Sequence, residues 1–290
     1  MRLAPGVSAA TLSNWLFGIL LGLVQGISEW LPIRSKTQII IVSSYLYGFT
    51  FQEAYAFGLF LEFATCVAAL IFFRREVYNV LQALVGRGDP EGRLLLKYLV
   101  VVTVITAIIG ATIYAVVSET VTGTVVGIPM LVLGAILIGD AAIIHFARGR
   151  RTPHRRLDQL GLSDLVIIGI VQGLAALPGV SRSGATVSAM LLLGLNPREA
   201  FRLSFLALMP AAVGAALLTL IFSKVEISTA VGAITLTALG VATVVAIVAS
   251  LLLIRGLLRV AASPRITTLV VGLGLIAIFS GIATLLVGTG

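Results

Sequence analysis

Charged residues inside apolar stretches are the strongest chemical signal in this sequence. Two are acidic, Glu29 and Glu62, and three are basic, Arg34, Lys36 and Arg182. A charge at membrane depth is costly and normally faces a cavity or a partner, so these residues mark a candidate site. The excess of positive charge favours an anion, and arginine suits the oxygens of a phosphate group particularly well.

The segment PGVSRSG, at residues 178–184, provides further donors for such an anion. Its glycines, Gly179 and Gly184, let the backbone approach a ligand, and the start of the following helix offers unpaired N–H groups. Three side chains add donors: Ser181, Arg182 and Ser183. The segment predicts an oxyanion cradle. The alternative is a serine-capped helix whose arginine reaches an interface.

The pattern around these residues occurs twice. The sequence GLVQGISEWLPIRSKTQ at residues 22–38 is matched by GIVQGLAALPGVSRSGAT at residues 169–186. The match places Gln25 opposite Gln172, at a separation close to half of the 290 residues. An internal duplication is the simplest account of this similarity.

The composition indicates an all-α polytopic membrane protein, because 59% of the residues are hydrophobic and only 11% are charged. The location of the charges argues against nucleic acid as the partner, although the pI is near 10.2. Each of six apolar segments is long enough to cross the ~30 Å hydrocarbon layer. These predicted transmembrane helices are 52–73, 93–117, 124–147, 197–222, 228–254 and 266–288.

The two copies of the pattern differ from these spans because each contains helix breakers, Pro32 in residues 13–48 and Pro178-Gly179 in residues 163–194. The arm after each break is about a dozen residues long, which is short for a span. Broken helices at membrane depth are tolerated where protein or water satisfies the freed backbone groups. We therefore predict two re-entrant helical hairpins.

This count predicts a single membrane domain, 1–290, built from an inverted repeat of residues 1–147 and 148–290. A hairpin returns to its starting side and three spans end on the opposite side, so the second half is inverted. Nearly all arginines and lysines outside the hairpins then fall on one face, which the positive-inside rule makes cytoplasmic. Both termini lie outside, and the hairpin tips meet near the midplane.

These residues carry a family resemblance. The chain resembles the undecaprenyl-pyrophosphate phosphatase (bacitracin-resistance) family over essentially its whole length. The motifs that carry the resemblance are Gln25, Glu29, Leu31-Pro32, Ser35, the FFRR stretch at 72–75 and PGVSRSG at 178–184. The resemblance implies an integral membrane enzyme that hydrolyses undecaprenyl (polyprenyl) diphosphate to the monophosphate and inorganic phosphate. In bacteria this reaction recycles the lipid carrier of cell-wall (peptidoglycan) synthesis on the outer side of the membrane.

The resemblance also implies roles for individual residues. Glu29 matches an acid associated with metal binding or acid–base work, Ser35 a proposed nucleophile or phosphate ligand, and Arg182 the arginine that holds the diphosphate. A serine that attacks phosphorus needs a base, and Glu29 is the nearest candidate in sequence. The expected phosphate ligands around them are Arg34, Lys36, Gly179, Ser181, Ser183 and Gly184, with Gln25, Gln38 and Glu62 in support. The expected cofactor is a divalent cation, Mg²⁺ or Ca²⁺, held by Glu29 with Glu62 as a second candidate ligand.

The chain departs from the family pattern at two positions. Gln38 stands where the family has a histidine, three residues after Ser35, and glutamine cannot transfer a proton at neutral pH. Glu62 stands where the family has a glutamine in the next span. Either Glu62 takes an acid–base or metal role, or it balances charge by pairing with Lys36 or Arg182. A third account is that hydrolysis was lost while binding of the lipid phosphate remained.

The third account defines the alternative function, a non-catalytic polyprenyl-phosphate carrier or flippase on the same fold. For either function the expected partners are the polyprenyl lipid and membrane lipids, with no nucleic acid; a homodimer is left open. We expect the chain in the cell (plasma or inner) membrane as a multi-pass protein whose site opens to the outer face.

Overall fold

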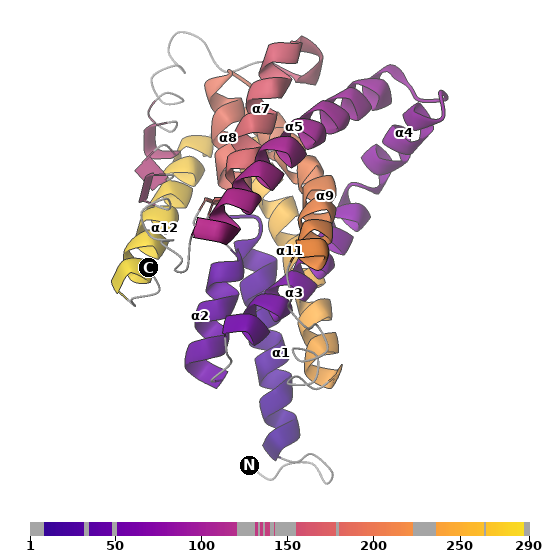
Figure 1. Ribbon diagram of the computed structural model, residues 1–290. Coiled ribbons are helices and arrows are strands. Elements are labelled where there is room, and N and C mark those ends of the chain that lie inside the picture. The colour runs from indigo at the N-terminus through magenta and orange to yellow at the C-terminus, as the bar shows by residue number, and fades with distance from the viewer. Residues whose placement is uncertain are drawn as a thin grey trace.

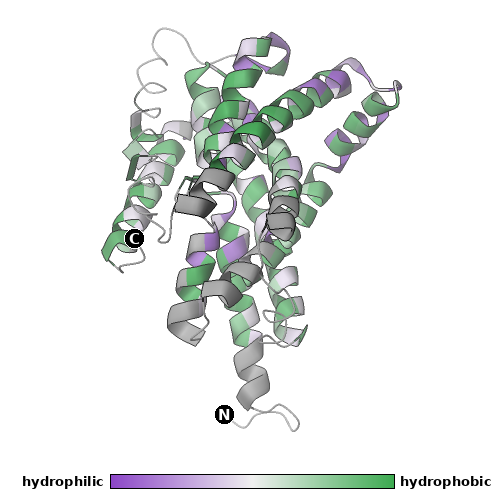
Figure 2. Ribbon diagram, viewed as in Figure 1, coloured by the Kyte–Doolittle hydropathy of each residue, from purple (hydrophilic) through white to green (hydrophobic). Residues whose placement is uncertain are grey.

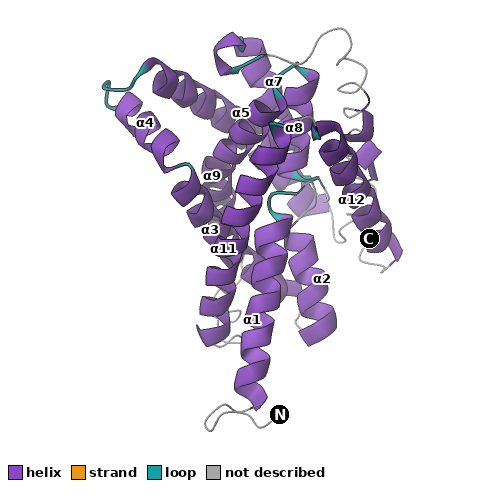
Figure 3. Cartoon of the chain, turned by 180° about the vertical axis from the view of Figure 1, so that it is seen from behind, coloured by secondary structure: helices purple, strands orange, loops and turns teal. Residues whose placement is uncertain are grey.

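The computed structural model describes residues 9–31, 35–47, 51–120, 155–177, 180–222, 236–263 and 265–286, with single positions between 131 and 142. These residues form helices joined by turns, and their only β-type pairing is an isolated bridge between Arg155 and Leu195 (Figures 1 and 3). The described part of the chain thus confirms the all-α fold class.

The first predicted hairpin, residues 13–48, is a pair of helices, α1 (Ala9–Ser28) and α2 (Ser35–Tyr47). They separate around Pro32, as its lack of an N–H predicts, although residues 32–34 themselves lie outside the described residues. The N–H of Glu29 still donates to the carbonyl of Gln25 at 3.1 Å. Glu29 is therefore held by the last turn of α1.

The second predicted hairpin, residues 163–194, is formed by α7 (Leu162–Leu174) and α8 (Arg182–Leu192), after a short 3₁₀ helix, η1 (Leu157–Gln159). The hydroxyl of Ser181 accepts a hydrogen bond from the N–H of Gly184 at 3.3 Å and caps α8. The cap makes Arg182 the first residue of that helix.

Helices also occur where four of the six spans were predicted, at 52–73, 93–117, 197–222 and 266–288. The predicted span 124–147 lies mostly outside the described residues. The long helices of the structure are α3 (Phe51–Phe72), α5 (Pro90–Thr120), α9 (Pro197–Phe222), α11 (Leu236–Ala261) and α12 (Ile266–Leu286).

The end of α11 differs from the predicted span 228–254, because the helix continues to Ala261. Leu257 and Ala261 pack into the core, whereas Arg255 and Arg259 lie on the exposed side of the same turns. The arginines suggested the end of an apolar segment in the sequence, but a helix that buries one face can continue past them.

The helix α4 (Arg74–Leu84), which joins α3 to α5 and has no buried residue, is not among the predicted elements. Its apolar side chains Tyr78, Leu81 and Leu84 are all more than half exposed. A short amphipathic helix of this kind is typical of a segment that lies along a membrane surface.

The two hairpins occupy opposite halves of the molecule. In Figures 1 and 3, α1 and α2 lie in the half that contains the N-terminus, and α7 and α8 lie in the other half. Each first arm packs against a helix from the opposite half of the sequence, α1 against α11 and α7 against α5. The turns of the two hairpins meet in the middle of the fold, which brings their polar residues together.

Glycines on the first arms allow this packing. A Cβ atom on Gly26 would lie 2.7 Å from the carbonyl oxygen of Ala246 in α11, and one on Gly173 would lie 2.6 Å from the Cβ of Ile109 in α5. Small residues let membrane helices approach until their backbones touch. The glycine positions therefore fix how deeply each hairpin sits.

Replacing Gly26 with alanine is expected to destabilise the protein by about 1–3 kcal/mol, because the added methyl group overpacks the contact with α11. Gly240, on α11, is the matched control, since a Cβ there meets nothing within 4 Å. Its replacement by alanine should be neutral or stabilising, as alanine favours helix formation. Thermal unfolding in detergent would compare the two, and equal effects would contradict the close approach.

The start of α7 is held by an ion pair that lies away from the apolar part of the fold. The guanidinium of Arg155 lies 2.5 Å from the Asp164 carboxylate, which also accepts from the N–H of Gly161 at 2.9 Å. Burial raises the pKa of Asp164, but the hydrogen bonds from Arg155 and Gly161 outweigh it and leave that pKa below its ordinary value.

A lowered pKa means that ionised Asp164 stabilises the folded state above its ordinary pKa of 3.8, and that this contribution is lost as the pH falls through the folded-state pKa. Asp164→Asn is therefore expected to lower the melting temperature near neutral pH and to have no effect in strong acid. The exposed Asp158 provides the control, Asp158→Asn. A pH-independent loss in Asp164→Asn would show that the charge contributes nothing.

The polarity of the structure is that of a protein surrounded by lipid. Large apolar side chains are exposed along whole helix faces, such as Ile19, Leu23 and Ile27 on α1, whereas Gln25 and Gln172 are buried. In Figure 2, hydrophilic residues lie at the α4–α5 turn, around the start of α7 and at the facing ends of α1 and α2. Two helices, Pro90–Ile113 and Leu236–Ala261, are long and apolar enough to cross a membrane within the described residues.

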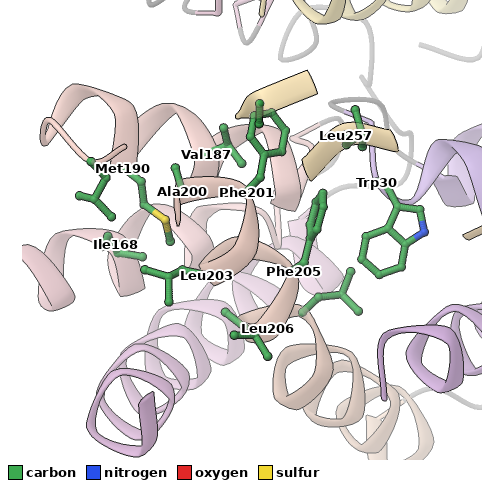
Figure 4. Close-up of a cluster of buried hydrophobic side chains, with 14 of the residues drawn as sticks. Trp30, Ile168, Val187, Met190, Ala200, Phe201, Leu203, Phe205, Leu206 and Leu257 are labelled. Atoms are coloured by element: carbon green, nitrogen blue, oxygen red, sulfur yellow. The ribbon is translucent and has the colours of Figure 1, made fainter. Parts of the chain in front are cut away.

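The hydrophobic core links the turn of the first hairpin to the second half of the chain. The indole of Trp30 packs edge-on against Phe205 of α9 with ring centroids 4.9 Å apart, and Phe205 packs against Phe201 (Figure 4). Trp30 is only 1% exposed. Its burial fixes the residue next to Glu29 and so fixes the position of that carboxylate.

Candidate active site

Glu29 lies at the centre of the site and contacts both hairpins. Its Oε1 atom lies 2.5 Å from a guanidinium nitrogen of Arg182, at the start of α8. Its Oε2 atom accepts hydrogen bonds from the hydroxyl of Ser35 at 2.7 Å and from the amide of Gln25 at 3.1 Å. Three predicted site residues therefore converge on one carboxylate, Gln25 and Ser35 from the same hairpin and Arg182 from the other.

Arg182 decides between the two interpretations of the PGVSRSG segment. The serine-capped helix is present, but the arginine points inward rather than to an interface. It pairs with Glu29, and its Nη1 atom also donates to the carbonyl of Leu208 in α9 at 3.3 Å. The guanidinium is thus fixed between the first hairpin and α9, where it can bind an anion that reaches the turn of α1.

The two serines that flank Arg182 join the hairpin turns. Ser183 donates its hydroxyl to the carbonyl of Leu31 at 3.0 Å, and Ser181 lies 3.4 Å from the same oxygen. Both serines and Gly184 are buried. Through these contacts the two serines hold the PGVSRSG segment, the predicted oxyanion cradle, against the turn of the first hairpin. Gly179 and Arg34, the other predicted phosphate ligands of the two turns, lie outside the described residues.

A second ion pair lies beside the first. The ammonium of Lys36, on α2, lies 2.9 Å from the carboxylate of Glu62 on α3, and their side chains are 14% and 11% exposed. Of the accounts left open for Glu62, the structure shows the pairing with Lys36. Arg182 is paired with Glu29 instead.

Gln38, at the position of the family histidine, is directed toward another helix. Its amide donates to the hydroxyl of Ser280 in α12 at 2.8 Å. The contact links α2 to α12. Ser280 could not be singled out from the sequence, because a serine in an apolar helix has many structural uses.

Comparisons of the sequence with known proteins give matches over most of its length. A family model described as "Bacitracin resistance protein BacA" matches residues 18–279. The chain belongs to the BacA family. A protein of Saccharolobus islandicus named undecaprenyl-diphosphatase is 51% identical over 240 residues, which cover 82% of this chain and 85% of that protein. A protein of the same name from Saccharolobus solfataricus is 50% identical over 240 residues, which cover 82% of this chain and 85% of that protein. Another from Pyrobaculum aerophilum is 42% identical over 212 residues, which cover 73% of this chain and 79% of that protein.

Membership of the BacA family confirms the resemblance seen in the motifs, but some residues of the site carry no motif signal. Thr186 and Ser204 lie with their hydroxyls 2.6 Å apart, and Thr186 also donates to the carbonyl of Arg182. They support the first turn of α8. The internal duplication could have pointed to Gln172, the counterpart of Gln25, which is 2% exposed and whose side chain makes no hydrogen bond to the described residues.

The BacA resemblance implies a divalent cation, and the carboxylates of Glu29 and Glu62 are its expected ligands. Both oxygens of Glu29 are engaged by Arg182, Ser35 and Gln25, and Glu62 is paired with Lys36. Among the described residues, no group of three or more His, Cys, Asp or Glu could hold a metal ion. Mg²⁺ and Ca²⁺ prefer several oxygen ligands, carboxylates above all. This arrangement does not fit a resident divalent ion, and the expected cofactor stays a prediction.

Proposed function

We propose that this chain hydrolyses a polyprenyl diphosphate, such as undecaprenyl diphosphate, to the lipid monophosphate and inorganic phosphate. The observation that carries the proposal is the carboxylate of Glu29, which binds the hydroxyl of Ser35 on one oxygen and the guanidinium of Arg182 on the other. A base thus contacts both a nucleophile and a phosphate-binding cation. Membership of the BacA family and relatives named undecaprenyl-diphosphatase support it.

The contact between Ser35 and Glu29 has the geometry of a nucleophile and its general base. In the proposed first step, the oxygen of Ser35 forms a bond to the terminal phosphorus, and Glu29 takes the hydroxyl proton. The bond from this phosphorus to the bridging oxygen breaks, and the lipid monophosphate leaves with the electron pair. Water then attacks the phosphoserine. The bond from phosphorus to the Ser35 oxygen breaks, and this oxygen regains the proton held by Glu29. The protons of the attacking water leave with inorganic phosphate, one of them passing to solvent at neutral pH.

Arg182 supplies the positive charge that phosphoryl transfer needs. Negative charge is spread over the oxygens of the transferred group, and cations already in place stabilise it. When Arg182 turns from Glu29 to the substrate, the carboxylate is left to accept the proton of Ser35. Two polar atoms of residues near Glu29 in the chain, Gln25 Oε1 and Trp30 Nε1, are buried and make no hydrogen bond to the part of the chain that the structure describes. They add a polar surface for the ligand.

The lipid part of the substrate matches the surface beside α1. A groove between α1 and α11 is lined only by aliphatic side chains: Leu23, Ile27, Val244, Val245, Val248, Ala249, Leu252 and Leu253. Such a lining suits an isoprenoid chain, whose burial is driven by apolar area. Ile27 lies in the last turn of α1, so the groove extends to the end of the helix that holds Glu29.

Release of inorganic phosphate tests the proposal. The purified protein in detergent, given undecaprenyl diphosphate, is expected to release phosphate and to leave the monophosphate lipid. The alternative, a non-catalytic carrier, is not favoured, because the base and the nucleophile are in contact. Movement of labelled lipid across vesicles without phosphate release would reverse this conclusion.

We also infer the membrane arrangement of the site. The chain has six spans and two re-entrant hairpins, arranged as inverted repeats of residues 1–147 and 148–290. Both termini lie outside, and the site opens to the outer face. Support comes from the opposite placement of the hairpins and the exchanged packing of their first arms. Further support comes from Arg202 of α9, which pairs with Glu76 of α4 and Glu91 of α5. The starts of three helices thus meet at one charged end, which we assign to the cytoplasm.

Labelling of single cysteines tests this orientation. Cys66 is the only cysteine and is buried, so Cys66→Ala gives a background without thiols. In that background Arg87→Cys, in the exposed α4–α5 turn, should react with an impermeant maleimide only after the cells are permeabilised. A cysteine added before Met1 should react in intact cells. The opposite pattern would place the site on the cytoplasmic side.

A further inference from the structure

We propose that the ammonium group of Lys36, held in place by Glu62, replaces a divalent cation in this chain. Phosphate release then proceeds without Mg²⁺ or Ca²⁺, because Lys36 and Arg182 together neutralise the diphosphate. The inference rests on the proposed function, and it gives the Lys36–Glu62 pair a role that the pairing alone does not reveal.

The first observation is that cations already occupy the carboxylates that would ligate a metal. Glu29 is in contact with Arg182 at 2.5 Å, and Glu62 is in contact with Lys36 at 2.9 Å. A divalent ion bound by these oxygens would have to displace both cations or lie beside them. Repulsion between a divalent ion and an ammonium group is large where little water screens it.

The second observation is that the two ion pairs act on one another. Glu29 interacts electrostatically with Glu62 and Lys36 as well as with Arg182. Lys36 follows Ser35 in the first turn of α2, and Ser35 donates to Glu29 at 2.7 Å. The ammonium is therefore close to the proposed reacting groups and is not an isolated surface charge.

The third observation concerns hydrogen-bonding capacity. An ammonium group has three donors and rotates freely about its terminal bond. Lys36 can therefore keep its contact with Glu62 and still donate to a phosphate oxygen. In the resting state, within the part of the chain that the structure describes, the carboxylates of Glu29 and Glu62 balance the cations Lys36 and Arg182. A diphosphate brings the negative charge that the two cations can then share. Glu62 acts as a positioning residue, which holds the ammonium in place.

The experiment compares phosphate release from undecaprenyl diphosphate in EDTA with release in added Mg²⁺ or Ca²⁺. The wild-type protein is expected to be equally active in both. Lys36→Gln should lose roughly 10²-fold in EDTA, as expected for loss of a cation that stabilises the transferred group. Added Mg²⁺ should restore much of this loss, because the variant frees the carboxylate of Glu62 for a metal.

Two further variants separate this role from a purely structural one. Lys36→Arg keeps the positive charge and should stay active in EDTA. Lys97→Gln removes an exposed lysine of α5 and should change neither the activity nor its dependence on metal. Binding of Mn²⁺, followed by its electron paramagnetic resonance signal, gives a readout without substrate. The wild type should show no tight binding, and Lys36→Gln should gain it.

Wild-type activity that EDTA abolishes and Mg²⁺ restores would overturn the inference while leaving the proposed phosphatase intact. Tight binding of Mn²⁺ by the wild type would overturn it as well. A wild-type protein that releases no phosphate under any condition would instead contradict the proposed function, and Mn²⁺ binding would still decide whether Lys36 excludes a metal. If Lys36→Gln fails to fold, the wild-type and Lys36→Arg measurements remain decisive.

Discussion

Replacing Arg182 with alanine is expected to lower phosphate release by roughly 10³-fold, because the variant loses the guanidinium that neutralises the transferred phosphate. The same change leaves the carboxylate of Glu29, whose side chain is 5% exposed, without its closest cation. Removing one partner of a buried ion pair costs about 3–5 kcal/mol of stability. Loss of activity and loss of stability should therefore occur together in Arg182→Ala.

A conservative variant separates the two effects. Arg182→Lys keeps a cation for Glu29 and should recover most of the stability, but its compact ammonium cannot bind two phosphate oxygens in parallel. Phosphate release should therefore stay low while the melting temperature returns. Arg198→Ala, at an exposed arginine near the start of α9, is the matched control and should resemble the wild type. Full activity in Arg182→Ala would exclude the assigned role of this residue.

Replacing Ser35 with alanine is expected to have the largest effect, a fall in turnover of roughly 10⁴-fold or more, as for other enzymes that lose their nucleophile. The reason is that the Ser35 hydroxyl is the group that donates to Glu29 at 2.7 Å. The turnover of Glu29→Gln should fall to a similar extent, because an amide can accept the hydrogen bond but cannot take the proton. The double variant should be little worse than either single change, since the two residues act as one unit.

Trapping of a phosphoenzyme distinguishes the covalent route from direct attack by water. Brief reaction with substrate labelled in the terminal phosphate should label the wild type at Ser35 and should not label Ser35→Ala. The control is Ser188→Ala, since Ser188 of α8 is also buried but its hydroxyl makes no hydrogen bond. This variant should keep wild-type activity. A labelled Ser35→Ala would place the nucleophile elsewhere.

The two adjacent ion pairs explain why the chain tolerates charge in an apolar setting. An unpaired charge removed from water costs several kcal/mol, and a close partner with further hydrogen bonds offsets much of this. Glu29 has three such partners, and the Lys36–Glu62 pair lies beside it. In the proposed site the arrangement holds Lys36 and Arg182 ready for a phosphate while a carboxylate balances each of them in the resting state.

Much of the helix arrangement was predictable because its signals are local. The breaks between helices lie where Pro32 and Pro178-Gly179 predicted them, since proline lacks an N–H and glycine has a free backbone, and both favour the end of a helix. Long apolar stretches predicted most of the long helices in the same way. Where the local signal was ambiguous the prediction was less accurate: arginines near residue 255 suggested an end, yet α11 continues to Ala261.

The sequence by itself determined which residues are the candidates for the chemistry, because a charge or a glycine within an apolar stretch is unusual whatever its surroundings. It could not determine their pairing. From the sequence, Glu62 could pair with either Lys36 or Arg182. The packing of α2 on α3 brings Lys36 to Glu62, and the packing of α8 against the turn of α1 brings Arg182 to Glu29. Pairing is a property of distances between elements that are far apart in the chain, and those distances are fixed by close contacts such as that of Gly26 with α11.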